Sequence, residues 1–200
     1  MLRTMSSSDH LAVQARDPLS QSAFPAGGTR PFAHPGMAQA PRVSSVSTQK
    51  RTREFNVTLP AGVRIGPALR ALLDDWHAGA GCGRIVDGTC TRIQYHLIEP
   101  SKADPRPYVY GAPVVCDGTN TMIGAAITIG NGGDGKRILH CHGGFIDADG
   151  ASHGGHFNLD ETLVGGDGLR LRLSLFEGVA LTVSHDSETA YDLLQPVYQS

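Results

Sequence analysis

The alternation of residues 169–175 constrains the fold more than any other feature of this 200-residue sequence. Leucine occupies every second position, and polar side chains lie between. The leucines are Leu169, Leu171, Leu173 and Leu175, and the intervening residues are Arg170, Arg172 and Ser174. Because the side chains of a strand point alternately to its two faces, this segment predicts a strand with one buried and one solvated face. Such a strand is typical of an antiparallel sheet.

Further short strands and one helix are predicted from the same kind of pattern. Strands are expected at residues 54–59, 83–91, 93–99, 108–116, 122–129, 137–146, 152–157 and 179–184. The helix is expected between Gly66 and Gly79, because Pro67 suits a first turn and the apolar residues from Leu69 to Trp76 recur at helical spacing. With 25 glycines and 6% aromatic residues, the chain is predicted to be an α+β domain built on an antiparallel sheet.

The composition changes near residue 52. Residues 1–52 hold eight serines, seven alanines and five prolines without apolar periodicity, so we predict a disordered tail at 1–52 and a folded domain at 53–197. The tail carries a formal charge of +4 and residues 53–200 carry −6. We interpret the tail as a solvated segment. A weak nucleic-acid-binding arm and an organelle transit peptide are the alternatives.

Several classes of protein are excluded by composition. No apolar run reaches the roughly 18 residues of a membrane span, so no membrane association is expected. The four cysteines are Cys82, Cys90, Cys116 and Cys141. They form no C-x-x-C pair, which excludes a zinc ribbon and a thioredoxin-type motif, and they do not suggest a disulfide framework. Reduced thiols indicate a cytoplasmic protein.

Four of the nine histidines fall between residues 140 and 156. His140 and His142 are two positions apart on a predicted strand, so both imidazoles project from the same face, and Cys141 projects from the other. The next segment, 148–150, suits a three-residue hairpin loop with Gly150 in the left-handed conformation. That loop would pair residue 147 with residue 151.

This register places His156 directly opposite His142 and diagonal to His140, while His153 faces away. The prediction depends on the loop, because a two-residue loop would move His156 to the other face. A bulge at Gly154 and Gly155 could also redirect it.

Three converging imidazoles predict a metal site formed by His140, His142 and His156. Ligation by imidazole without thiolate favours Zn²⁺, with Fe, Ni, Cu and Mn as alternatives, and three protein ligands leave one coordination position open. The alternative is a polar patch of three hydrogen-bonded histidines. Asp160 or Glu161 could orient a ligand imidazole or serve as a base, unless they are solvated loop acids.

Other polar residues are weaker candidates. His96 could add a fourth polar group to the site, although a hydrogen-bonded core histidine is the simpler interpretation. Asp147 and Asp149 are expected to act as turn residues. The glycine-rich loop 130–135 lacks the Lys-Ser/Thr of a P-loop, so phosphate binding is not expected there.

The segments His140-x-His142, 147–150 (Asp-Ala-Asp-Gly) and 154–156 (Gly-Gly-His) resemble the signature of the PPC (plant and prokaryote conserved) domain. The resemblance covers roughly residues 53–197. It implies a mostly antiparallel β-sheet flanked by a few helices, a homotrimer, and in prokaryotic members a metal at His140, His142 and His156. In plants the domain follows AT-hook motifs, and no AT-hook is present here. The strand around 113–117 also departs from the family pattern, and both departures speak against DNA binding.

The same histidine arrangement is similar to that of acetolactate decarboxylase and of a zinc-dependent ester hydrolase family with this fold. The resemblance implies a three-histidine zinc site, and only the metal ligands can be transferred, since no matching catalytic Glu or Arg motif is found.

Three function classes therefore remain. The first is a homotrimeric PPC-like domain with a zinc or small-ligand site. The second is a zinc-dependent lyase or ester hydrolase for a small carboxylate or ester, which requires an arginine and a carboxylate in a pocket around the histidines. The third is a DNA-associated regulator, which is not favoured because the domain is acidic.

Overall fold

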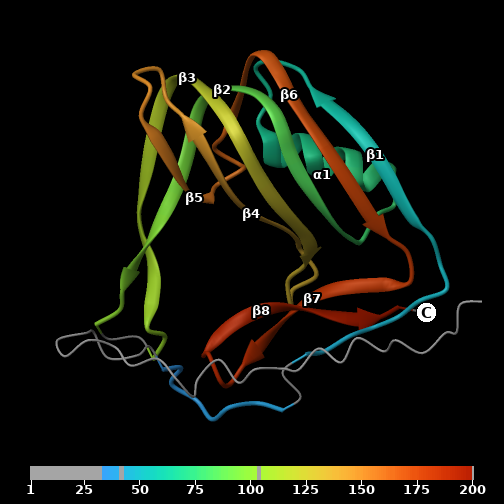
Figure 1. The fold of residues 1–200 in the computed structure, drawn as a ribbon. Coiled ribbons are helices and arrows are strands. Elements are labelled where there is room, and N and C mark those ends of the chain that lie inside the picture. Colours follow the sequence, from blue (N-terminus) through green and yellow to red (C-terminus); the bar gives the residue numbers. More distant parts are fainter. Residues whose placement is uncertain (1–32, 41–42, 103–104, 200) are drawn as a thin grey trace, which may run out of the picture. The chain divides into compact units, whose positions relative to one another are not determined.

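The computed structural model describes residues 33–40, 43–102 and 105–199. Its strands form one eight-stranded sheet in the order β1-β6-β2-β5-β4-β3-β7-β8, with an additional pairing of β2 with β3 (Figure 1). All pairings are antiparallel except a single parallel pair between β3 and β7. The described part of the chain contains one helix, fewer than the resemblance implied. The bounds are β1 Thr52–Leu59, α1 Ile65–Asp75, β2 Ala80–Pro100, β3 Tyr108–Asn131, β4 Arg137–Ile146, β5 Ser152–Phe157, β6 Leu163–Phe176, β7 Val179–Asp186 and β8 Tyr191–Tyr198.

The predicted alternation of β6 is confirmed. The exposed fractions of Leu169, Leu171, Leu173 and Leu175 do not exceed 1%, so their shared face forms part of the core. Buried side chains of α1 and aliphatic and aromatic side chains of other strands complete this core. They include Ile85, Ile127, Phe145 and Phe157.

The predicted helix is present, but it ends earlier than expected. Its last residue is Asp75, and the left-handed residue after it is His77, with a φ of 52°, rather than Gly79. The His77 amide donates to the Asp74 carbonyl at 3.0 Å and the Ala78 amide donates to the Leu73 carbonyl at 2.9 Å. These two bonds satisfy carbonyls of the last turn as in a Schellman motif, so a histidine takes the position that glycine usually holds.

The strands β2 and β3 correct a second expectation. The segments 83–91 and 93–99 were predicted as separate strands, as were 108–116 and 122–129. Each pair is instead one continuous strand, of 21 residues in β2 and 24 in β3. Their pairing shifts register between Cys90 and Arg92 and between His96 and Ile98. Bulges of this kind bend a strand without ending it, which explains why the sequence pattern breaks where the strand does not.

Only the first strand of the C-terminal hairpin, β7, is predicted from the sequence. β7 pairs with β8, a strand that no pattern in the sequence predicts. β8 contains Pro196 and has no buried residue, so it lacks the apolar alternation that identifies a strand.

The predicted disordered tail lies largely outside the described residues. Its described parts, 33–40 and 43–51, contain no helix or strand. Within them the amide of Gly36 donates to the Glu188 carbonyl at 2.8 Å and the amide of Gln39 donates to the Glu188 carboxylate at 2.7 Å. These residues therefore contact the turn between β7 and β8.

The one helix of the described residues has 11 residues, and it is too short and too polar to cross a lipid bilayer.

Candidate metal centre

The hairpin of β4 and β5 has the predicted register. The Asp147 amide donates to the Ala151 carbonyl at 3.0 Å, and Gly150 adopts a φ of 83°. The Asp147 carboxylate accepts hydrogen bonds from the amides of Asp149 and Ala151, at 3.0 and 2.8 Å. Asp147 therefore organises the turn, and the three-residue loop sets the pairing of every residue behind it.

This register brings the three predicted histidines together on one face. His142 is paired directly with His156. The imidazole centroids lie 4.8 Å apart for His140 and His142, 4.9 Å for His140 and His156, and 5.1 Å for His142 and His156. One nitrogen from each ring lies within 4.8 Å of the others. It is the only group of three or more His, Cys, Asp or Glu residues of this kind among the described residues.

The donor set suits a divalent transition metal. A tetrahedral metal bound at 2.0–2.1 Å would require imidazole nitrogens about 3.3 Å apart. The Nδ1 atom of His156 already lies 3.4 Å from Nε2 of His142. The whole set of nitrogens lies within 4.8 Å, so the side chains would have to move closer for one ion to contact all three.

Burial and mutual repulsion lower the pKa of two of the three imidazoles, those of His140 and His156. The pKa of His156 falls from 6.5 to about 4, because burial penalises the charged form and because His140, His142 and His96 lie close to it. Burial and His142 also lower the pKa of His140. A neutral imidazole is the form that binds a metal, so these two residues are poised as ligands at neutral pH.

The neighbouring residues on the hairpin face the other side, as predicted. Cys141 is fully buried, and burial raises the pKa of its thiol to about 12. His153 donates from Nε2 to the Asp147 carboxylate at 2.7 Å, because a carboxylate can only accept, and its Nδ1 accepts from the Tyr95 hydroxyl at 3.2 Å. Cys141 and His153 are therefore not part of the cluster.

Glycines in the hairpin allow the strands to approach closely. A Cβ atom on Gly143 would lie 2.5 Å from the Ala125 Cβ atom and 2.7 Å from the Gly124 carbonyl oxygen. A Cβ atom on Gly155 would lie 2.5 Å from the His96 carbonyl oxygen. Larger residues at these two positions would push β4 away from β3 and β5 away from β2.

Two residues of the long strands extend the cluster. The Tyr110 ring stacks on His156, with centroids 4.5 Å apart, and its hydroxyl lies 3.1 Å from His156 Nδ1. His96 is paired with His156 across β2 and β5, and its Nδ1 donates to the Gly111 carbonyl at 2.9 Å. His96 is thus a hydrogen-bonded histidine, the simpler of its two interpretations, and it also lies beside the cluster. Tyr110 was not anticipated there, because a bulge separates it from the part of β3 that pairs with β2 around His96.

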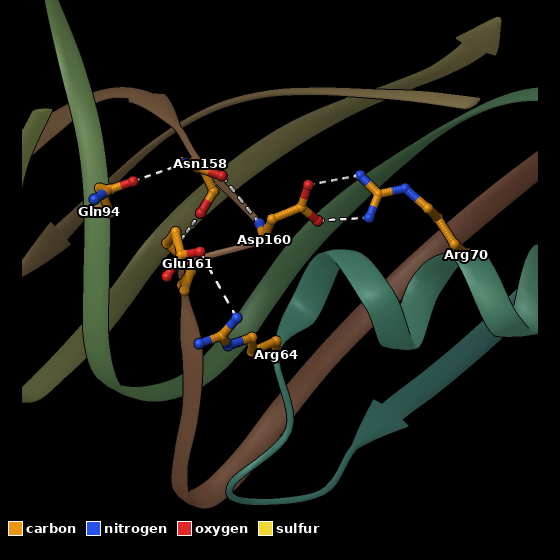
Figure 2. Close-up of polar contacts among 7 residues, drawn as sticks. Arg64, Arg70, Gln94, Asn158, Asp160 and Glu161 are labelled. Atoms are coloured by element: carbon orange, nitrogen blue, oxygen red, sulfur yellow. Dashed lines mark hydrogen bonds and ion pairs between the residues drawn. The ribbon is translucent and has the colours of Figure 1, made fainter. Parts of the chain in front are cut away.

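Asp160 and Glu161 do not take the role that was considered for them. The Asp160 carboxylate accepts two hydrogen bonds from the Arg70 guanidinium, at 2.5 and 2.9 Å, and Glu161 lies 3.7 Å from Arg64 (Figure 2). Asn158 links this loop to β2 by donating to the Gln94 side chain at 2.7 Å. Both acids thus pair with arginines and not with the imidazoles.

A cavity of about 810 Å³ opens beside the cluster. Its wall includes His140, His156 and Tyr110, and also Arg106 and Asp192. A cation and a carboxylate therefore share one cavity with two of the three histidines.

The wall of this cavity is held by a link between β8 and β3. The Tyr191 hydroxyl donates to the Tyr108 carbonyl at 2.7 Å and accepts from the Tyr108 amide at 3.2 Å. The Arg106 guanidinium carbon lies 5.9 Å from the centre of the Tyr191 ring, in reach of a cation–π contact.

Comparison with known proteins identifies the fold. Neither protein-family models nor curated proteins match the sequence. Solved structures do match. A plant- and prokaryote-conserved (PPC) protein from Pyrococcus horikoshii is similar with a TM-score of 0.59 and 16% identity, over 78% of this chain and 99% of that chain.

Two further structures have the same fold. A metal-containing protein from Archaeoglobus fulgidus matches with a TM-score of 0.60 and 16% identity, over 76% of this chain and 99% of that one. A protein from Bacteroides thetaiotaomicron, named as a putative DNA-binding protein, matches with a TM-score of 0.57 and 11% identity, over 74% and 96%. The chain therefore has the fold of the PPC proteins, a mostly antiparallel β-sheet with a single short helix in its described part.

Proposed function

We propose that this protein is a metal-binding domain of the PPC fold, in which His140, His142 and His156 hold one divalent transition metal. The observation that carries the proposal is the convergence of three imidazole nitrogens within 4.8 Å on the face opposite the core. Three imidazoles without a thiolate suit zinc best. The name of the Archaeoglobus fulgidus structure, a metal-containing protein, is consistent with this role.

The open side of the cluster supports a ligand-binding role. Three protein ligands leave a coordination position for a small molecule or water. The cavity of about 810 Å³ includes His140 and His156 in its wall. Its volume is within the range of pockets that bind small molecules.

One observation favours a second candidate, a zinc-dependent lyase or ester hydrolase. This hypothesis requires an arginine and a carboxylate next to the histidines, and the cavity contains Arg106 and Asp192. A metal bound there would supply a Lewis acid for a carbonyl group or an activated water. Arg106 would hold the carboxylate of the substrate, and Tyr110 would direct its hydroxyl toward the ligand that occupies the open position.

We also propose that the protein self-associates as a homotrimer in a reducing compartment. Adjacent residues of β2 and β3 expose large apolar side chains on both faces of the β2–β3 ribbon: Leu97, Ile98, Val114 and Val115 are 51%, 63%, 37% and 37% exposed. A strand pair that is apolar on both faces needs cover on both. All four cysteines are free, as expected for the cytoplasm.

Metal content tests the proposal. Elemental mass spectrometry on the untagged protein is expected to give about one transition metal per chain, and the H140A/H142A double variant should lose it. His185→Ala is the matched control for metal content, because this exposed histidine lines the same cavity and pairs with Asp192 but is not one of the three converging imidazoles. A folded wild-type protein that takes up no metal after addition of zinc at pH 7.5 would refute both the metal site and the enzyme hypothesis.

A further inference from the structure

Two arginines face each other on the solvated side of the sheet. Arg84 of β2 is paired directly with Arg172 of β6, and both side chains are exposed. Like charges at directly opposed positions destabilise an antiparallel pair. The pair therefore costs stability unless a negatively charged group lies beside it.

The acids of the neighbouring strands do not neutralise this pair. Glu54 accepts a hydrogen bond from Ser174 at 2.7 Å, and Asp87 pairs with Arg170. Among the described residues, neither Arg84 nor Arg172 has an ion pair with an acid. Two positive charges are thus left facing solvent on one patch of the surface.

This patch is continuous with the histidine cluster. Arg84 is paired with Ala126 of β3, and Ala126 is paired with His142 of β4, so all three side chains point to the same face. Neighbouring strands are about 4.8 Å apart, which places the backbone of Arg84 about 10 Å from that of His142. Only the methyl group of Ala126 lies between them.

A hollow of about 460 Å³ occupies this position. Arg84, Ala126 and His142 line it, together with the apolar side chains of Val86 and Ile123. Val86 is 41% exposed and Ile123 is 62% exposed. The hollow therefore combines a cationic end, an apolar wall and the edge of the proposed metal centre.

We propose that Arg84 and Arg172 form an oxyanion subsite that binds the phosphate or carboxylate group of a small ligand with an apolar body. Arginine presents planar pairs of N–H donors that match such groups, and a bound anion removes the repulsion within the pair. The apolar part of the ligand would lie against Val86 and Ile123, and its other end would face His142. The placement of one end of the ligand at His142 rests on the proposed metal-binding function. Anion binding by the two arginines does not depend on it.

The test is the binding of phenyl phosphate, benzoate and inorganic phosphate, measured by calorimetry on metal-free and on zinc-loaded protein. We expect the metal-free wild type to bind phenyl phosphate or benzoate, and the R84Q/R172Q variant to bind at least 10-fold more weakly. Arg170→Gln is the matched control, because Arg170 lies on the same face of β6 but is paired with Asp87. It should retain affinity within about 2-fold. The affinity for phenyl phosphate compared with that for benzoate identifies whether the subsite prefers a phosphate or a carboxylate group.

Comparing metal-free with zinc-loaded protein distinguishes anion binding by the arginines from metal binding by the histidines. Affinity that rises on zinc loading supports a ligand spanning both sites, whereas arginine-dependent binding in a protein that takes up no metal supports the anion subsite alone. Equal affinity of wild type and R84Q/R172Q for all three anions would overturn the inference. Loss of duplex DNA binding or of self-association in R84Q/R172Q, without any small-anion binding, would also overturn it. Circular dichroism should show an unchanged fold, since both side chains are exposed.

Discussion

The low pKa of His156 makes the metal-free protein sensitive to acid. The imidazole titrates at about 4 in the folded chain, against 6.5 as its ordinary value. Between these pH values the unfolded chain binds more protons than the folded chain, so the free energy of unfolding falls as the pH falls. The difference between the two pKa values corresponds to a change of about 3 kcal/mol in the free energy of unfolding. Solvent access to this half-buried cluster reduces that change to about 1–2 kcal/mol. This stability is present above pH 6.5 and lost towards pH 4.

The assay compares urea unfolding of wild type and His156→Gln in the presence of a chelator. The single tryptophan, Trp76, stacks on Phe55 with ring centroids 4.1 Å apart, so its fluorescence should report unfolding. Subtracting the variant removes the contributions of titrating groups that do not interact with His156. We expect the wild type to lose about 1–2 kcal/mol relative to the variant between pH 7 and pH 4.5. A difference that stays constant over this range would refute the electrostatic reasoning.

Two further predictions follow from packing. Gly143→Ala should abolish metal binding, because the new Cβ atom would lie 2.5 Å from the Ala125 Cβ atom and push β4 away from β3. Elemental analysis of the purified variant measures its metal content. A full metal complement would contradict the prediction. Native protein at pH 8 should react with Ellman's reagent at the exposed Cys82 but not at Cys90 or Cys141, whose burial raises the pKa of each thiol to about 12. Peptide mapping by mass spectrometry distinguishes the sites, and rapid labelling of Cys141 in the native protein would show that the core side of β4 is open to solvent.

The histidine cluster could be predicted from the sequence because its three residues lie within one local hairpin. The register of β4 and β5 depends only on the loop at 148–150, and the glycine there identifies the loop type. His142 and His156 are therefore positioned by a few consecutive residues. No long-range contact has to be known in order to place them on one face.

The surroundings of the cluster could not be predicted in this way. Tyr110 and His96 belong to long strands, and the register of these strands shifts between His96 and Ile98. Each bulge adds one residue to one strand and reverses the face of every side chain beyond it. The sequence pattern instead suggested that β2 and β3 each break into two strands. Nothing in that pattern indicated that a tyrosine of β3 would stack on His156.

The three imidazoles and the residues that would select a bound molecule differ in the same way: the first depend on local register, the second on distant strands. The hairpin can bring three imidazoles together without help from distant strands, because its register is local. The groups that could select a ligand come from elsewhere in the chain: Arg106 and Tyr110 on one side, and Arg84 on the other. Proteins of this fold that keep the hairpin but change the bulges of β2 and β3 would have a similar histidine cluster with different neighbours. A shared histidine hairpin is therefore evidence for a shared imidazole cluster, while the bound molecule has to be argued from the side chains that surround each individual site.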